Sequence, residues 1–328
     1  MWSDSETNFG AGSPSMPSPR PGKFCTPFEF FDPPPRGGWL FLYKVLDNNV
    51  PFQKATGAPM LSPQKIDELA HFALELGAAA AAVTLPHFRS GLGVDNKRGH
   101  YAFDPVTAAD RDAETAIRKL IGERYPDHGV LGEEHGNHDG ASDLTWVIDP
   151  IDGTRSFITG VPLWGTLIAL NDGARPVIGL MAQPYIGETF LGRPGGSELI
   201  GPHGTRALKT SSCTRLEEAL LGNTDPGMFR RDDEKAAFRE LTSKVKLRRF
   251  GGDCYFYCLL AAGTLDLVVE SSLQPYDIQA LIPIIENAGG VVTSWSGGDA
   301  QQGGQVVAAA NAELHAAALE ILAPAADA

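Results

Sequence analysis

Apolar residues recur at helical spacing between Ile66 and Phe88, which predicts a long helix with one buried face. Ser62 and Pro63 stand just before this segment. A serine side chain can accept a hydrogen bond from a free N–H group of the first turn, and proline lacks the N–H group that this turn would leave unpaired. We therefore expect the folded part of the chain to begin directly after Met60.

Helical and strand-like patterns alternate from Asp104 onward, which predicts an α/β chain, and no internal repeat of short period is visible. The predicted helices cover residues 107–124, 234–245, 253–262, 276–287 and 312–322, with a short helix after Gly153. The predicted strands cover residues 165–170, 177–183, 265–270, 290–294 and 305–309, and one more ends at Ile148. We expect two lobes, over residues 60–205 and 206–328.

Residues 1–59 follow neither pattern. They hold 10 of the 24 prolines of the chain, including Pro33–Pro35, and a stretch rich in Ser, Pro and Gly. Segments of this composition rarely bury enough apolar surface to fold. We interpret them either as a disordered extension or as upstream sequence translated from a start that precedes Met60.

The charge and cysteine content narrow the classes of function. The 328 residues include 27 Lys and Arg against 40 Asp and Glu, a formal net charge of −13, which argues against binding to nucleic acid or to an anionic membrane. The four cysteines lack the spacing of a zinc site or a disulfide framework. The apolar run Trp39–Tyr43 is far shorter than the roughly 20 residues of a membrane span, and we recognise no secretory signal. We therefore expect a cytoplasmic protein.

The segment Trp146–Thr154 is the densest candidate for chemistry. Its apolar residues predict a buried strand that delivers Asp149, and Pro150 is expected to end the strand because proline cannot donate to the ladder. Asp152 then precedes Gly153 and a short helix. Two carboxylates therefore leave one strand end, three residues apart.

Glu133 and Asp277 extend this candidate site, because the first ends another short apolar run and the second begins a predicted helix. If these carboxylates converge with Asp149 and Asp152, each pair about 4 Å apart costs roughly 4 kcal/mol at an effective dielectric constant near 20. Protons or cations must then relieve the repulsion. Oxygen ligands without His or Cys favour a hard ion such as Mg²⁺. The free N–H groups where a helix begins after Gly153 suit a phosphate.

Four ordered motifs resemble those of the lithium-sensitive, magnesium-dependent phosphatases of the inositol monophosphatase superfamily, from Met60 to the C-terminus. The motifs are Asp104–Asp110, Gly132–Glu134, Asp149–Thr154, and Pro275–Asp277 followed by Gly289-Gly290. The resemblance implies a layered αβαβα sandwich of the inositol monophosphatase and fructose-1,6-bisphosphatase type. It also implies a hydrolase that acts on a small phosphorylated metabolite with two or three Mg²⁺ ions per site, and a homodimer.

The resemblance also implies roles for individual residues. One Mg²⁺ would be held by Glu133, Asp149 and the carbonyl oxygen of Ile151, a second by Asp149, Asp152 and Asp277, and a third ion would lie near Glu133. The attacking water would be oriented and deprotonated by Asp110 and Thr154, with Glu133 beside them. The phosphate would contact Asp152, Gly153, Thr154 and Arg155, and the rest of the substrate Asp253, Glu270 and Asp277.

Sequences outside the metal motifs most resemble histidinol-phosphate phosphatases, which act in histidine biosynthesis. They are Arg155–Phe157, Pro162–Leu170, Gly252–Tyr255 and Gln274–Asp277. Asp253 beside Glu270 would favour a cationic leaving group. The alternative is that Asp253 caps the helix that follows it, and it could do both. The alternatives are an inositol-1-monophosphatase and a catalytically silent phosphate-binding protein on the same fold. Tyr276 and Asn287 depart from the usual Trp and Glu of the family, and neither is an expected ligand.

Overall fold

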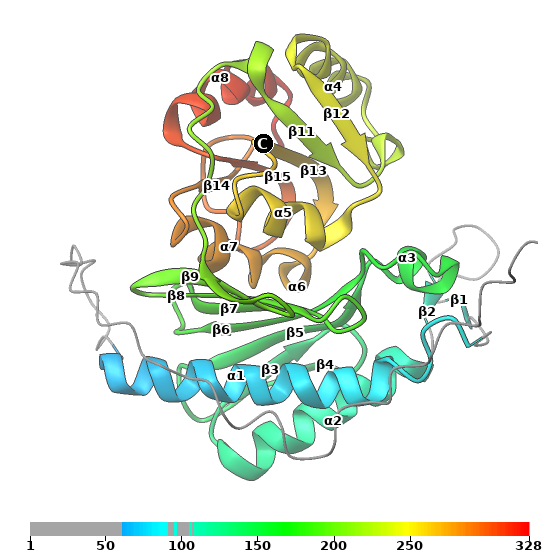
Figure 1. Cartoon of the computed structure of the whole chain (residues 1–328), viewed down its shortest axis with the longest axis vertical. Helices are drawn as coiled ribbons and strands as arrows, with labels where there is room; N and C mark the ends of the chain where they lie inside the picture. The colour runs from blue at the N-terminus through cyan, green and yellow to red at the C-terminus, as the bar shows by residue number, and fades with distance from the viewer. Residues whose placement is uncertain (1–60, 91–94, 97–104, 107, 328) are drawn as a thin grey trace, which may run out of the picture. The chain divides into compact units, whose positions relative to one another are not determined.

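Two large β-sheets with helices on both faces make up the described part of the chain (Figure 1). The computed structural model describes residues 61–90, 95–96, 105–106 and 108–327, all within one compact unit, Asn49–Ala328. The expected extension over residues 1–59 and the start at Met60 lie outside the described residues. The boundary between two lobes near residue 205 stays a prediction.

The larger sheet has eight strands in the order β10-β9-β8-β7-β6-β5-β3-β4. Its strands are β3 (Gly129–Gly132), β4 (Gly136–His138), β5 (Thr145–Asp152), β6 (Gly165–Asn171), β7 (Pro176–Gln183), β8 (Glu188–Arg193), β9 (Gly196–Gly201) and β10 (Gly204–Ala207). Only β3 and β5 pair in parallel among these neighbours. Two short strands, β1 (Asp95–Asn96) and β2 (Pro105–Val106), form a separate pair.

The smaller sheet has five strands in the order β12-β11-β13-β15-β14. They are β11 (Leu220–Asn223), β12 (Leu247–Phe250), β13 (Leu267–Leu273), β14 (Val291–Ser294) and β15 (Gly304–Ala309). β11 runs parallel to both of its neighbours, and the other pairs are antiparallel. The pairing of β13 with β15 shifts between Glu270 and Leu273, so a bulge follows Glu270.

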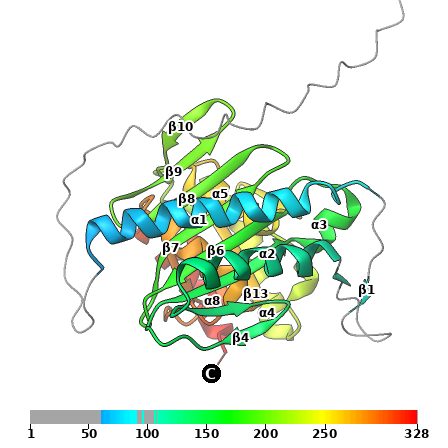
Figure 2. The same ribbon diagram turned by 90° about the horizontal axis from the view of Figure 1, so that it is seen from below.

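Helices α1 (Pro63–Thr84) and α2 (Ala108–Arg124) cover one face of the larger sheet, side by side (Figure 2). Their apolar residues pack with strands β5 to β8 in one core, where Phe72 contacts Trp146 edge to face. As expected, Ser62 caps α1 by accepting a hydrogen bond from the Lys65 N–H group at 3.2 Å. Helix α1 ends at Thr84, four residues before the predicted end.

The other helices form a middle and an outer layer. Helices α5 (Asp253–Ala261), α6 (Pro275–Ile278) and α7 (Leu281–Glu286) lie between the two sheets and share a core with both. Helices α4 (Asp232–Lys244) and α8 (Ala312–Leu322) cover the far face of the smaller sheet. A short helix, α3 (Thr154–Thr159), follows β5, and single turns η2 (Leu216–Glu218), η3 (Pro226–Met228) and η4 (Ala323–Ala325) complete the fold. The layers confirm the expected αβαβα sandwich.

The helix predicted over residues 276–287 is two helices, α6 and α7. The break between Ile278 and Leu281 leaves Pro283 in the first turn of α7, where its missing N–H group costs nothing. A continuous helix would have placed this proline in its interior. The prediction was wrong here because the apolar pattern alone does not locate a break.

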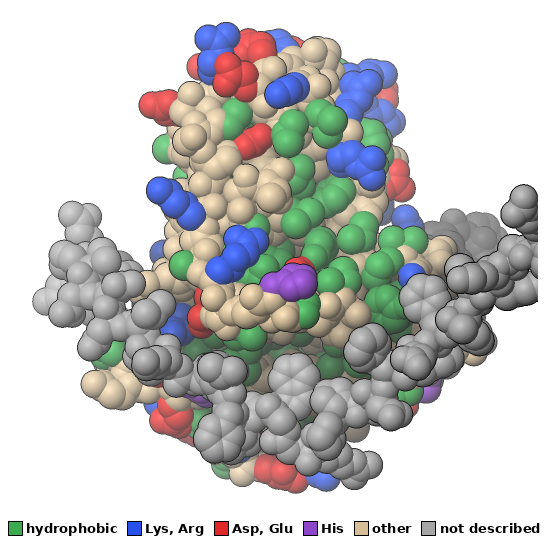
Figure 3. Space-filling model, in the orientation of Figure 1, with side chains coloured by type: hydrophobic (Ala, Val, Ile, Leu, Met, Phe, Trp, Pro, Cys, Tyr) green, Lys and Arg blue, Asp and Glu red, His purple; other side chains and the backbone are tan. Residues whose placement is uncertain are grey.

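The surface charge bears on nucleic-acid binding, and the length and apolar character of the helices bear on membrane insertion. On the face seen in Figure 3, Lys and Arg side chains stand in small groups among acidic and uncharged residues. Within the described ranges, none of the helices combines the length and the apolar character that crossing a membrane requires.

Candidate active site

Strand β5 carries Asp149 into the interior between the two sheets. Trp146 and Ile148 are fully buried on this strand, and Asp149 is only 2% exposed. The Ile151 N–H group donates to Asp149 Oδ1 at 3.0 Å, which fixes the carboxylate beside its own backbone. This hydrogen bond fixes the orientation of the buried carboxylate, in which it can bind a ligand.

Pro150 does not end the strand, contrary to the sequence prediction. β5 continues to Asp152, with an irregular register between Asp149 and Asp152, and Asp152 pairs with Gly165 of β6. The missing N–H group of Pro150 is accommodated in this irregularity, and its carbonyl oxygen accepts a hydrogen bond from Thr166 Oγ1 at 2.8 Å. Both carboxylates therefore sit on one strand rather than on a strand and a loop.

Asp277, near the start of α6, completes a cluster with Asp149 and Asp152. One carboxylate oxygen from each lies within 4.8 Å of the others. The Gln274 N–H group donates to Asp277 Oδ2 at 2.7 Å and orients that side chain. Asp277 is far from Asp149 and Asp152 along the chain, and the structure brings the three residues together.

Burial and mutual repulsion raise the pKa values in this cluster. The pKa of Asp149 is raised well above its usual value by burial and then by the charge of Glu133, and burial likewise raises the pKa of Asp277. Burial raises the pKa of Asp152 to about 7. A hydrogen bond joins the side chains of Glu133 and Asp149, so Glu133 lies beside the group of three.

The cluster suits a divalent cation. It offers carboxylate oxygens and no His or Cys ligand among the described residues, which favours Mg²⁺ over zinc. Burial and the charges of neighbouring carboxylates raise the pKa values of these groups, and a bound cation would lower them. When bound, Mg²⁺ would supply the charge that stabilises the attacking and leaving oxygens of a phosphoryl transfer.

Metal-free protein should become less stable as the pH rises from about 4 to about 7. Burial raises the pKa of Asp152 and of Glu270 to about 7, whereas carboxyl groups of an unfolded chain titrate near pH 4. Between these values the unfolded chain has released protons that the folded chain retains, so rising pH favours unfolding. We expect the melting temperature of EDTA-treated protein to fall by several degrees over this range, and saturating Mg²⁺ at pH 8 to restore it. A melting temperature that stays constant or rises with pH would contradict the grouping of these carboxylates.

The turn after β5 leads into α3. Gly153 has a left-handed backbone, with φ of 78°, which residues with a side chain rarely adopt. A Cβ atom at Gly153 would also lie 2.9 Å from Asp253 Oδ2, so this position has room for glycine only. Thr154 Oγ1 donates to the Ile151 carbonyl oxygen at 3.1 Å, which joins a predicted water-activating residue to a predicted metal ligand.

Asp110 and Arg155 take different places around this turn. Asp110 is 1% exposed in the first turn of α2, and its neighbour Ala109 belongs to the same small apolar core as Ile151. The start of α2 therefore lies against the turn that carries Thr154. The Arg155 side chain is exposed and pairs at 3.8 Å with Asp225, the N-cap residue of η3, and it does not line the cavity described next.

A cavity of about 110 Å³ opens beside the carboxylate cluster. It is lined by Asp152, Thr224, Met228, Asp253, Cys254, Tyr257, Glu270, Leu273 and Asp277. All three expected substrate residues are in this lining. Sequence reasoning missed Thr224, Met228 and Tyr257. Of these three, only Tyr257 could have been found from the sequence, because it follows Asp253 by one turn of the predicted helix.

Glu270 is fixed by three hydrogen bonds at the wall of the cavity. The Thr224 N–H and Oγ1 groups donate to Glu270 Oε1 at 2.9 and 2.5 Å, and the Tyr257 hydroxyl donates to Oε2 at 3.2 Å. The side chain is nevertheless buried, and this burial raises its pKa. A cation in the cavity would therefore be a favourable partner for Glu270.

Asp253 is not the helix cap that its position suggested as one alternative. Gly252 occupies the N-cap position of α5, and Asp253 is the first helical residue, with a left-handed φ of 44°. Its Oδ2 atom accepts a hydrogen bond from Ser156 Oγ at 2.6 Å, and the next N–H group, of Cys254, donates to Asp152 Oδ2 at 2.8 Å. The start of α5 thus holds both ends of the turn between β5 and α3.

The layered fold and the buried carboxylate cluster define a metal-dependent phosphatase type of site. The inositol monophosphatase family matches residues 65–324. The bifunctional phosphatase IMPL2 of Arabidopsis thaliana is 40% identical over 273 residues, 80% of this chain and 77% of its own. A histidinol-phosphatase of Mycobacterium tuberculosis is 35% identical over 247 residues, 74% and 94% of the two chains.

A solved structure shows the same relationship. An inositol monophosphatase from Zymomonas mobilis superimposes with a TM-score of 0.69 at 37% sequence identity, over 78% of this chain and 98% of its own. The chain therefore belongs to the inositol monophosphatase family, and it is a phosphatase of phosphoric monoesters.

Proposed function

We propose that this phosphatase converts histidinol phosphate to histidinol and inorganic phosphate, as a step of histidine biosynthesis, with Mg²⁺ as its cofactor. The observation that carries the proposal is the lining of the cavity. Asp152, Asp253, Glu270 and Asp277 contribute four carboxylates, and among the described residues that line it there is no Lys, Arg or His. Relatives of 34 to 37% identity named histidinol-phosphatase support the same substrate.

The chemistry of the substrate matches this lining. Histidinol phosphate presents an ammonium group and an imidazole on the side away from the phosphate, and charged hydrogen bonds to carboxylates would hold both. Asp149, Asp152 and Asp277 would hold Mg²⁺, which leaves Glu270 and Asp253 to face the organic part of the substrate. A neutral polyol would gain less from two buried carboxylates.

The remaining roles are proposals of the same kind. Glu133 and the Ile151 carbonyl oxygen would complete the metal ligands, for two or three ions in all. Asp110 and Thr154, with Glu133, would orient and deprotonate the attacking water. The N–H groups of Gly153 and Thr154 would bind the phosphate, with Asp152 and Arg155 beside them. We also propose a homodimer in the cytoplasm.

Glu270→Gln should lower kcat/KM for histidinol phosphate about ten- to hundredfold, because a charge-assisted hydrogen bond contributes about 1.5 to 3 kcal/mol. The ester p-nitrophenyl phosphate should lose little, since its leaving group carries no cationic group for Glu270 to bind. Phosphate release from both substrates measures the two values. Asp253→Asn tests the second carboxylate in the same way.

Glu188→Gln is the matched control, because Glu188 also accepts a hydrogen bond from a tyrosine hydroxyl, that of Tyr255, and does not line the cavity. It should leave the ratio of the two kcat/KM values unchanged. Equal losses on both substrates for Glu270→Gln would count against a cationic leaving group, and equal losses for Asp253→Asn would mean that this residue acts through Ser156. Faster hydrolysis of inositol 1-phosphate by the unmodified enzyme would favour the inositol-1-monophosphatase alternative. No phosphate release from any ester would favour the silent binding protein.

A further inference from the structure

Arg89, five residues beyond the end of α1, has a backbone and a side chain that are both strongly constrained. Its φ is 61°, a left-handed value that L-residues other than glycine rarely adopt. The guanidinium lies over the Phe88 ring at 5.1 Å and over the Tyr185 ring at 4.7 Å, and Nη1 donates to the Tyr185 hydroxyl at 2.6 Å. A strained backbone persists only where surrounding contacts hold it, and such contacts concentrate at functional sites.

The remaining donors of Arg89 meet the C-terminal end of α3. Nε and Nη2 both donate to the Gly160 carbonyl oxygen, at 2.9 and 2.7 Å. Gly160 is the C-cap of α3, with φ of 76°, and a Cβ atom there would lie 3.3 Å from Arg89 Cγ. The last carbonyl groups of a helix carry partial negative charge, so a cation at this end stabilises the helix.

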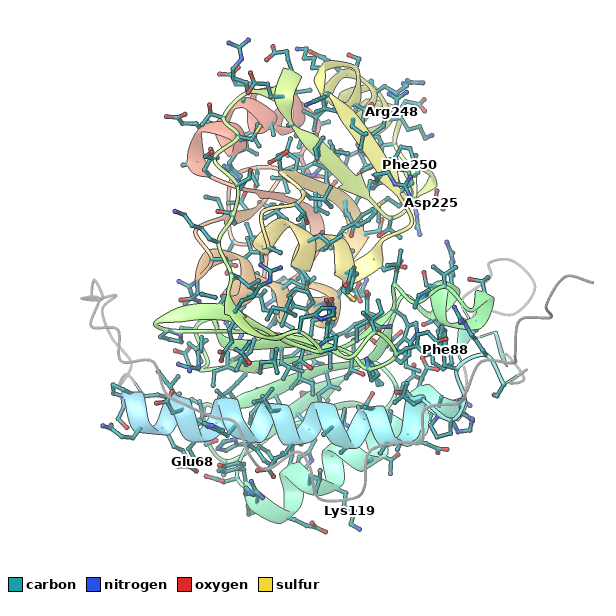
Figure 4. All side chains as sticks on the ribbon, viewed as in Figure 1. Glu68, Phe88, Lys119, Asp225, Arg248 and Phe250 are labelled. Atoms are coloured by element: carbon teal, nitrogen blue, oxygen red, sulfur yellow. The ribbon has the colours of Figure 1, made fainter. Side chains whose placement is uncertain are left out.

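The residue next to Arg89 supports α3 from its buried side. The Phe88 ring contacts the rings of Phe157 and Trp164, each at 5.4 Å between centroids, and Phe157 lies on α3 itself. On the opposite side, α3 meets the smaller sheet's half of the fold through Ser156 and Asp253. In Figure 4, α3 lies between the labelled side chains of Phe88, which follows α1, and Asp225, which precedes η3.

A contact at one end of α3 acts on the other end because the helix is short. Six residues at 1.5 Å per residue span roughly 9 Å, and such a segment moves as one body. Its other end is the turn of Gly153 and Thr154, which our proposed function assigns to the phosphate. Of the described side chains, Arg89 is the cation that contacts the C-cap of this helix.

We propose that Arg89 is a positioning residue for the phosphate-binding turn, which it holds in place through the C-terminus of α3. It touches neither the substrate nor the proposed metal ligands. The inference rests on the proposed function, because it takes Gly153 and Thr154 as the phosphate contacts. A purely structural Arg89 would affect the melting temperature and leave phosphate affinity unchanged.

The test measures inorganic phosphate binding to the full chain in saturating Mg²⁺, both by calorimetry and as the inhibition constant against p-nitrophenyl phosphate. Arg89→Ala should weaken phosphate binding about tenfold and lower kcat ten- to hundredfold, because small displacements of a binding group have effects of this size. Arg89→Lys should recover part of the loss, since lysine keeps the charge without the planar pair of donors. The Mg²⁺ concentration for half-maximal activity should stay within twofold.

Arg124→Ala is the matched control. Arg124 is the last residue of α2, at the opposite end of this helix from Asp110, and it lies over the Phe72 ring at 4.8 Å and pairs with Glu75 at 2.9 Å. It should lower the melting temperature by a similar amount and leave phosphate binding unchanged. Phosphate affinity within twofold of the unmodified protein in Arg89→Ala, or an equal loss in Arg124→Ala, would overturn the inference. A protein that binds phosphate and releases none from esters would overturn the proposed function instead, and the calorimetric comparison would still decide the role of Arg89.

Discussion

Asp149→Asn should lower kcat by several orders of magnitude and leave the fold intact. Asp149 is proposed as a ligand of both principal Mg²⁺ ions, and an amide cannot supply the negative charge that both require. The asparagine has nearly the same size, and its amide oxygen can still accept the Ile151 N–H group. Phosphate release at saturating Mg²⁺ measures kcat, and circular dichroism checks the fold.

The same variant should raise the melting temperature of metal-free protein, because it removes one of several buried like charges. Asp266→Asn is the matched control. Asp266 is also buried and also accepts a backbone hydrogen bond, from the Leu220 N–H group at 2.7 Å, and it lies outside the cluster. It should lower the melting temperature and change kcat only a few-fold. Near-normal turnover in Asp149→Asn would show that this residue is not a metal ligand.

Removal of divalent cations should abolish activity completely. Burial and then mutual repulsion raise the pKa values of Asp149, Asp152 and Asp277, and without a cation the same repulsion would also act on a phosphate dianion. Dialysis against EDTA, followed by assays across added Mg²⁺, measures the effect, and full activity should return. Calcium serves as a control, because its larger radius and looser coordination fit the same ligands less well for catalysis. Turnover that survives in verified metal-free enzyme would contradict the proposed mechanism.

The helices that the sequence predicted best are those with a regular apolar face. Helix α8 has the predicted bounds, Ala312–Leu322, and α2 begins one residue from its predicted start. Each helix packs one face on a sheet, so its apolar residues recur at helical spacing along the sequence. The strands β8 to β12 had no such signal. β10 and β12 are exposed along their whole length, Gly192 interrupts β8, and β9 begins and ends with glycine.

The candidate site was predictable where short motifs carry it. Asp149 and Asp152 belong to one strand end, and Asp277 to a motif of its own, so a resemblance of motifs was enough to group them before any geometry was known. Pro150 was misjudged because a register shift in the ladder absorbs the missing donor, and a single sequence does not reveal the partner strand.

Contacts between distant segments could not be predicted. The hydrogen bonds of Thr224 to Glu270 and of Arg89 to Gly160 join residues that are 46 and 71 positions apart in the chain. No local sequence pattern marks either pair, because each depends on how two elements pack together in the tertiary structure. The left-handed backbone at Asp253 is likewise a consequence of the tertiary structure, since aspartate has no intrinsic need for it.

Asp149 and Asp152 lie on β5 of the larger sheet, and Asp277 lies on α6, which follows β13 of the smaller sheet, so the three carboxylates meet only when both sheets have formed and packed together. An ion held by Asp149, Asp152 and Asp277 is therefore a removable cross-link between β5 and α6. Such a cross-link cannot form in a partly folded chain, because neither segment alone supplies the full set of carboxylate oxygens. Mg²⁺ should consequently slow unfolding far more than it speeds folding, and its concentration in solution would set how long each molecule stays in its native state.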